Sequence, residues 1–359
     1  MSVSRFGVVP RFAFFGVLVT GVAVASFAGD QTGPLTISES GSTLIYPLFN
    51  SWIAEYTKVD PQLHLTASAT GSGAGINEVI AKHVEIGTSD AYMSDNQGMA
   101  NPHILNIPLA ISAQTIDANL PELRGKPLKL SGPVLAGIYS GKIREWDAAP
   151  IAEMNQGVSL PHKTIVPVRR SDSSGDTFIF TQFLTFSTPV WEDSIGYGTS
   201  VKWPSVAGSA TASSNQQMIE TIARTPYAIG YVGVSFEDAA DKAGLITAML
   251  KNQDGKFLLP TEATITAAAA ALTPRTPADE RLTLVFAPGA DSYPLINYEY
   301  AIVSSQQPNP QVASAISNFL IWSISPQGGS AKSLLDPVHF IALPISIRAR
   351  SEMQIAKIQ

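Results

Sequence analysis

From residue 35 onward, short apolar runs rich in β-forming residues alternate with segments of helical periodicity. The run PLTISES precedes YPLFNSWIAEYTK, LHLTASA precedes GINEVIAKH, and TIVPVRR precedes DTFIFTQFL. Such alternation predicts βαβ units and mostly parallel sheets. In the last helical segment Phe178, Phe180, Phe183 and Leu184 have a spacing that suits core packing. The pattern therefore predicts the α/β class, and 359 residues are enough for two domains.

Proline and glycine punctuate two segments that are far apart in the sequence. These are NIPLAISAQ, near residues 106–114, and APGADSYPLINYEY, near residues 287–300. Both are suitable places for the chain to pass from one lobe to another. We therefore expect one discontinuous lobe, residues 29–112 and 293–359, and a second lobe, residues 113–292. The alanine-rich segment TITAAAAALTPRTPADER predicts a surface helix closed by a proline-bearing turn.

The first 28 residues have the features of an export signal. Arg5 and Arg11 form a positive region, residues 12–25 are apolar, and Ser26-Phe27-Ala28 is a small-x-small cleavage site. An uncleaved membrane anchor is the alternative, but glycine and threonine interrupt the apolar run, which is short for a bilayer span. There is no cysteine to carry a lipid. The mature protein is thus expected in the periplasm, neither inserted in the membrane nor a lipoprotein.

Composition excludes several classes of function. Loss of residues 1–28 removes two arginines and no acid, so the net charge changes from −6 to −8, which disfavours a nucleic-acid partner. Without cysteine there is no disulfide and no thiolate metal site. The five histidines are scattered without metal-ligand spacing, and no G-x-S-x-G is present. We therefore expect neither a metal, nor a cofactor, nor an enzyme.

Three strand-to-helix junctions are rich in glycine and hydroxyl side chains. They are SESGSTLIYP at residues 38–47, ATGSGAGIN at residues 69–77 and RRSDSSGDTF at residues 169–178. Unpaired backbone N–H groups and a partial positive charge at a helix start favour an anion. Each junction alone is compatible with an ordinary helix cap. Three together, one carrying Arg169 and Arg170, indicate an oxyanion site. GSGAGI lacks the final glycine of a dinucleotide motif, and no P-loop lysine follows.

These segments resemble the periplasmic phosphate-binding proteins of high-affinity phosphate ABC transporters. The resemblance runs over nearly the whole mature chain through GSTLIYP, TGSGAGI, IGTSDAYMSD, GIYSGKIREWD, VRRSDSSGDTF, TSVKWP and TPYAIGYV. It implies the two-lobed periplasmic binding protein fold of type II, with a two-stranded hinge and the ligand in the interlobe cleft. It also implies capture of inorganic phosphate and docking to a permease driven by ATPase subunits.

The resemblance carries the ligand contacts onto particular positions of this chain. These are Thr43, the backbone of Leu44, Ser72, Asp90, Arg170, Ser174 and Gly175. An arginine can make charge-assisted bonds to an oxyanion, and hydroxyls can donate to it. An ionised Asp90 can only accept, which suits a phosphate that keeps a proton and disfavours fully ionised sulfate.

Asp176 departs from the commonest family pattern, which has threonine there. It would either contact the ligand, so that binding tightens below neutral pH, or serve as an acid in the first helical turn. Asp172 is expected either to orient Arg170 or to face solvent, and Arg169 to be a surface or hinge-side charge. The alternatives for function are a binding protein for arsenate, molybdate or sulfate, and a phosphate sensor without a transport role.

Overall fold

The computed structural model describes Gly7 and residues 34–359 of the chain. Apart from Gly7, the expected signal peptide lies outside the described residues. Residues 34–359 form one compact unit. Within them no helix is both long and apolar enough to cross a membrane.

A nine-stranded sheet organises this unit. Its strand order is β2-β1-β3-β12-β4-β8-β6-β7, with β9 paired to β4. The strands are β1 (Leu35–Gly41), β2 (Leu63–Thr66), β3 (Ile86–Ser89), β4 (Ile104–Ala118), β6 (Val166–Arg170), β7 (Ala210–Ala212), β8 (Ala228–Gly233), β9 (Ile246–Thr247) and β12 (Ile296–Ser304). A small second sheet has the order β11-β10-β5 and consists of β5 (Lys129–Leu130), β10 (Met249–Lys251) and β11 (Phe257–Leu258).

Each end of the large sheet is parallel, as the sequence predicts. β1 pairs in parallel with β2 and β3 at one end, and β6 pairs in parallel with β7 and β8 at the other. The antiparallel pairs involve β4 and β12, which lie between the two parallel groups. The expected α/β architecture is therefore confirmed, with two antiparallel strands joining its two parts.

Strand β4 changes its partner partway along its length. From Ile104 to Ala113 it pairs with β12, and from Gln114 to Ala118 it pairs with β8. Proline at position 108 is accommodated where the register between β12 and β4 shifts, next to Tyr300. This long strand and β12 are the two segments in which the sequence suggests that the chain passes between lobes.

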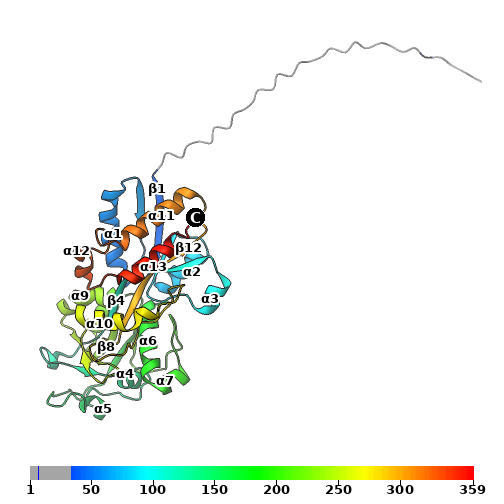
Figure 1. The fold of residues 1–359 in the computed structure, drawn as a ribbon. Coiled ribbons are helices and arrows are strands. Elements are labelled where there is room, and N and C mark those ends of the chain that lie inside the picture. Colours follow the sequence, from blue (N-terminus) through cyan, green and yellow to red (C-terminus); the bar gives the residue numbers. More distant parts are fainter. Residues whose placement is uncertain (1–6, 8–33) are drawn as a thin grey trace, which may run out of the picture. The chain divides into compact units, whose positions relative to one another are not determined.

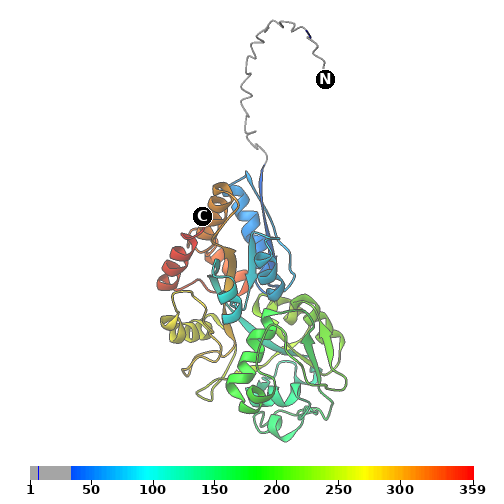
Figure 2. The same cartoon turned by 90° about the vertical axis from the view of Figure 1, so that its right-hand side faces the viewer.

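Helices pack around the sheet, and several of them begin after the carboxyl end of a parallel strand. In Figures 1 and 2 the elements coloured blue to cyan and orange to red gather at one end of the described unit, and the green elements gather at the other. The helices are α1 (Tyr46–Val59), α2 (Ser72–Ile80), α3 (Asp95–Ala100), α4 (Gly132–Tyr139), α5 (Ala149–Ala152), α6 (Gly175–Ser187), α7 (Pro189–Ser194), α8 (Asn215–Arg224), α9 (Glu237–Lys242), α10 (Glu262–Leu272), α11 (Pro310–Ser323), α12 (Lys332–Leu335) and α13 (Ile345–Ile355).

The aromatic residues of α6 are part of the core, as their spacing predicts. Phe180 and Phe183 are fully buried, and Phe180 stacks on Tyr231 of β8 with ring centroids 4.5 Å apart. The alanine-rich segment forms α10, which is followed by the single turn Thr273–Arg275 containing Pro274. With these faces packed, the starts of α1 and α2 and those of α6 and α8 are held at fixed positions between the two parallel groups of strands, which run in opposite directions.

Candidate functional site

The first hydroxyl-rich junction connects β1 to α1. Its backbone packs so tightly on β3 that a side chain at Gly41 would collide with the carbonyl oxygen of Thr88. Ser42 Oγ accepts a hydrogen bond from the Leu44 N–H at 3.0 Å, so this amide is engaged within the loop. Leu44 is fully buried, and its side chain fills the space beside Gly233 of β8. The junction thus places Thr43, itself buried, where the two parallel parts of the sheet approach each other.

The second junction begins α2 and supports the acid that follows β3. Gly71, with φ of +97°, turns the backbone so that Ser72 is the first helical residue. Ser72 Oγ donates to Asp90 Oδ2 at 3.2 Å and accepts from the Asp90 N–H at 3.1 Å. Ser42 Oγ donates to the other oxygen, Asp90 Oδ1. Asp90 is therefore a buried carboxyl group held by two neutral hydroxyls.

The third junction begins α6 and meets the second directly. Ser174 caps the helix by accepting from the Thr177 N–H at 3.3 Å. A methyl group on Gly175 would collide with Asp90 Oδ2 and Ser72 Oγ. Beside it, the Gly73 N–H donates to the Ser173 carbonyl at 2.9 Å. The start of α6 therefore lies directly against Asp90 and Ser72, as the sequence-based assignment of these residues to one site requires.

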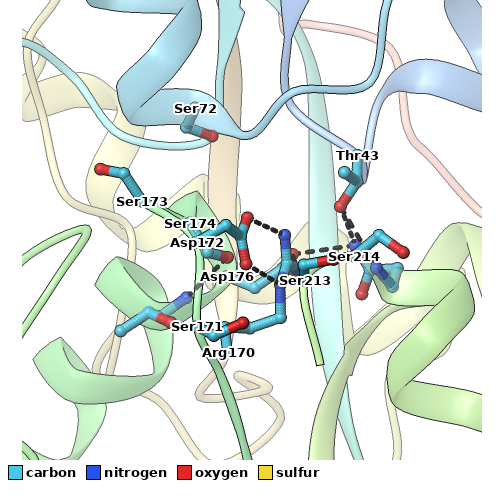
Figure 3. Close-up of polar contacts among 12 residues, drawn as sticks. Thr43, Ser72, Arg170, Ser171, Asp172, Ser173, Ser174, Asp176, Ser213 and Ser214 are labelled. Carbon is cyan, nitrogen blue, oxygen red and sulfur yellow. Dashed lines mark hydrogen bonds and ion pairs between the residues drawn. The ribbon is translucent and has the colours of Figure 1, made fainter. Parts of the chain in front are cut away.

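Arg170, the last residue of β6, is buried with two carboxylate partners (Figure 3). Its Nε donates to Asp172 Oδ1 at 2.7 Å and its Nη2 to Asp172 Oδ2 at 2.6 Å. Its Nη1 donates to Asp176 Oδ2 at 2.5 Å. Burial alone would lower the pKa of Arg170, but the charges of Asp176 and Asp172 raise it above its ordinary value. The expectation that Asp172 orients the guanidinium is confirmed.

Asp176 is almost completely buried in the first turn of α6. Besides the bond from Arg170, its Oδ2 accepts from Asn215 Nδ2 at 2.8 Å. Its Oδ1 accepts from Gln114 Nε2 at 3.0 Å, so both oxygens have protein donors. Ser174, and not Asp176, caps the helix. In this arrangement Asp176 fixes Arg170 from the side opposite Asp172.

A fourth strand-to-helix junction, which the sequence analysis did not single out, completes the arrangement. It follows β7 and contains Ser213, Ser214 and Asn215, with Ser214 accepting from the Gln217 N–H at 3.2 Å as the cap of α8. Asn215 Nδ2 donates to Thr43 Oγ1 at 2.9 Å, and Asn215 Oδ1 accepts from the Gly233 N–H at 2.7 Å. The segment TASSNQQ has the same hydroxyl-rich character as the other three junctions, which is the signal that could have revealed it.

Asn215 connects the two ends of the site. Through it Thr43, which follows β1, is linked to Asp176 and so to Arg170. The structure therefore brings the eight residues that the resemblance points to for the ligand site to the meeting point of four helix starts: Thr43, Leu44, Ser72, Asp90, Arg170, Ser174, Gly175 and Asp176. Arg169, by contrast, is half-buried with its guanidinium carbon 6.0 Å from the centre of the Trp203 ring.

The electrostatics of the site centre on Asp90. Burial raises the pKa of Asp90 well above its ordinary value, and the neighbouring carboxyl groups of Glu299 and Asp176 raise it further. Arg170 is the cation of the cluster and is shared between Asp172 and Asp176. Within residues 34–359 no group of three or more histidine or acidic side chains is placed to hold a metal ion. The partial positive charges of the helix starts are thus the remaining attraction for an anion.

This is the two-lobed α/β fold of type II periplasmic binding proteins, with a polar site where the lobes meet. A family model described as the PBP superfamily domain matches residues 28–327. The phosphate-binding protein PstS of Pasteurella multocida is 32% identical over 319 residues, which cover 89% of each chain.

Solved structures show the same fold at lower identity. A phosphate-binding protein of Stenotrophomonas maltophilia is 18% identical with a TM-score of 0.65, and the match covers 89% of this chain and 93% of that one. An ABC-type phosphate transport receptor of Vibrio cholerae is 18% identical with a TM-score of 0.53, covering 86% of this chain and 100% of that one. The chain belongs to the PBP superfamily and, within it, to the family of the phosphate-binding proteins named PstS.

Proposed function

We propose that this chain is an extracytoplasmic solute-binding protein that captures inorganic phosphate and delivers it to an ABC permease for ATP-driven uptake. The observation that carries the proposal is the meeting of four helix starts at one buried arginine, Arg170, and two buried acids, Asp90 and Asp176. The names of the curated relatives support the same ligand.

The site residues have complementary roles in this proposal. Arg170 supplies charge-assisted hydrogen bonds, and its two carboxylate partners hold the guanidinium plane in place before the anion arrives. Thr43 and Ser174 donate hydroxyl hydrogens, and the backbone amide of Gly175 donates from the start of its helix. The Ser72 hydroxyl and the Leu44 amide donate to the anion after they release Asp90 and Ser42, their partners in this structure. Asp176 then acts through Arg170. The guanidinium does not have to be reoriented, which limits the entropy lost on binding.

Asp90 supplies the selectivity. An ionised carboxylate accepts the hydrogen of a phosphate hydroxyl, whereas sulfate at neutral pH has no hydrogen to offer. Two acceptors facing each other in a buried site leave an unpaired group, which costs about 1–3 kcal/mol or more when charged. Phosphate should accordingly bind at least about tenfold more tightly than sulfate.

Titration calorimetry of the purified mature chain with phosphate, arsenate and sulfate tests the proposal. We expect saturable binding of phosphate, binding of arsenate because it shares the proton, and no measurable binding of sulfate. Preference for sulfate over phosphate would assign the site to another oxyanion. Absence of heat with all of these anions would overturn the proposal.

The transport role requires a permease and its ATPase as partners, and a periplasmic location. Disruption of the gene in the source organism should lower uptake of radiolabelled phosphate at low external concentration. Normal uptake together with a changed response to phosphate starvation would instead support a sensor.

We also propose that residues 29–112 and 293–359 form one lobe and residues 113–292 the other, which the partner change of β4 at Gln114 supports.

We further propose that the chain has no enzymatic activity. A chromogenic phosphate ester tests this directly: no release of product is expected, and turnover that depends on Asp90 would contradict it.

A further inference from the structure

A buried acid on the strand between the lobes has no role in the ligand set described above. Glu299 of β12 is fully buried. Its Oε1 accepts from Ser112 Oγ at 2.5 Å and from Asn297 Nδ2 at 3.0 Å. Its second oxygen, Oε2, is buried and has no hydrogen-bond donor among the described residues. A buried carboxylate oxygen without a hydrogen-bond donor costs free energy, so a neighbouring group is expected to compensate it.

The sheet register places Glu299 beside Asp90. Strand β12 runs antiparallel to β3 with Tyr300 opposite Ser89, so Glu299 comes next to the residue that follows β3. The two carboxyl groups are within hydrogen-bonding reach of each other. Two carboxylates can form a hydrogen bond only if one of them carries a proton.

The charges around this pair make double ionisation unfavourable. Asp176 of α6 adds a negative charge near both members. Arg170 of β6 is already paired with Asp172 and Asp176. Glu39 of β1 lies one strand away and is bonded to Thr88 Oγ1 at 2.6 Å.

The groups that bond directly to the pair are neutral. They are the hydroxyls of Ser42, Ser72 and Ser112 and the amide of Asn297. The pair is thus compensated by a proton and not by a cation, as in buried carboxyl dyads generally.

We propose that Glu299 is a positioning residue that shares one proton with Asp90 and holds that proton when the anion is bound, leaving Asp90 ionised as the acceptor. This inference rests on the proposed function. Asp90 is the better place for the charge because two serines donate to it and the start of α6 lies against it. The bound anion then faces one negative charge from the pair and not two.

Burial raises the pKa of both carboxyl groups, that of Glu299 from 4.5 to about 7, while the hydrogen bond between them raises the pKa of Asp90 and lowers that of Glu299. Without the anion the shared proton therefore lies on Asp90, and it moves to Glu299 when the anion binds. In alkaline solution the pair loses this proton and binding of the anion requires its return. The phosphate affinity of the wild type should therefore fall about tenfold per pH unit on the alkaline side, in addition to the effect of the ionisation of phosphate itself.

The variant Glu299→Gln tests the proposal, because an amide donates to Asp90 but cannot ionise. Phosphate affinity is measured by calorimetry from mildly acidic to alkaline pH for the wild type, E299Q and the control E280Q, which alters a buried glutamate bonded to Ser351. We expect E299Q to lose the alkaline fall of the wild type, and E280Q to keep it. The ionisation of phosphate contributes equally to all three proteins. Parallel profiles for the wild type and E299Q would overturn the proposal.

Two further measurements separate this proposal from the proposed function. If the wild type binds no phosphate, the proposed function fails, and the pH dependence of unfolding without ligand still tests the shared proton. The free energy of unfolding of E299Q should then decrease less than that of the wild type as pH rises from about 4.5 to 7, and an equal decrease would refute the shared proton.

If E299Q does not fold, Ser112→Ala replaces it. Removing a donor to Glu299 should shift the alkaline fall in phosphate affinity to higher pH, and an unshifted profile would count against the proposal.

Discussion

At the scale of single residues, the site depends on groups that are held before a ligand arrives. Arg170 receives Asp172 on one edge and Asp176 on another, and Asp176 is fixed in turn by Gln114 and Asn215. The guanidinium therefore has little rotational freedom to lose on binding.

Asp90→Asn is expected to abolish discrimination between anions. The amide can donate to sulfate and no longer accepts as a carboxylate does, so phosphate affinity should fall about tenfold to a hundredfold and sulfate binding should appear. Calorimetry with both anions measures this. Asp95→Asn, an exposed acid at the start of α3, is the matched control and should match the wild type. Retained selectivity in D90N would show that Asp90 does not face the anion.

Gly175→Ala is expected to prevent tight binding. The added methyl group would occupy the space between the start of α6 and the side chains of Asp90 and Ser72. The helix must then move away, and we expect phosphate affinity to fall at least about tenfold, as a misplacement of about 1 Å does at preorganised sites. Gly98→Ala on α3, where the new methyl meets only the flexible end of Arg281, is the control. Unchanged affinity in G175A would mean that α6 does not approach the ligand.

The residues that sequence reasoning found and those that it missed differ in their local context. Thr43, Ser72 and Arg170 lie in junctions whose glycines and hydroxyls are visible in a short window. Gln114 and Glu299 lie within apolar strands, and their polar role becomes apparent only when β4 and β12 pair with each other and with β3. No local pattern contains that pairing.

At the scale of elements, the helix starts were predictable and their mutual contacts were not. The segments for α1, α2 and α6 follow from apolar periodicity after a β-rich run, and the structure confirms them. The fourth helix start belongs to α8, which is strongly amphipathic. The role of this start in the site depends, however, on the contact of Asn215 with Thr43.

Asn215→Ala is expected to destabilise the described unit. It removes bonds to Thr43, Asp176 and the Gly233 N–H, all of which are buried. Loss of a partner from a buried polar group costs about 1–3 kcal/mol, and we expect a decrease of that size in the free energy of unfolding in urea. Ser213→Ala, in the same junction but exposed, should change it by less than about 0.5 kcal/mol. Equal effects of the two substitutions would contradict the bridging role of Asn215.

At the scale of the whole molecule, several acids outside the Arg170 cluster are buried. Burial raises the pKa of Glu39 from 4.5 to about 8, of Glu280 from 4.5 to about 8, and of Asp117 from 3.8 to about 6. The folded chain thus binds protons that the unfolded chain releases.

The free energy of unfolding should therefore decrease as pH rises from about 4.5 to about 8. The stabilisation is fully present below the unfolded pKa and is lost as pH passes the folded value, since the unfolded state binds fewer protons in this range. Urea unfolding across this interval, without phosphate, provides the measurement, and an unchanged denaturant slope would show that the same transition is followed. Stability that increases from mildly acidic to mildly alkaline buffer would contradict the assignment of these groups as protonated when folded.

The position of β12 has a consequence for how the chain reaches its native state. In the sheet this strand lies between β3 and β4, yet in the sequence it comes about 180 residues after β4. A nascent chain therefore exposes the edges of β3 and β4 until its last sixth has been synthesised, and cannot close its first lobe early. The open edges of β3 and β4 therefore create a need for protection from aggregation until Ile296–Ser304 has been synthesised.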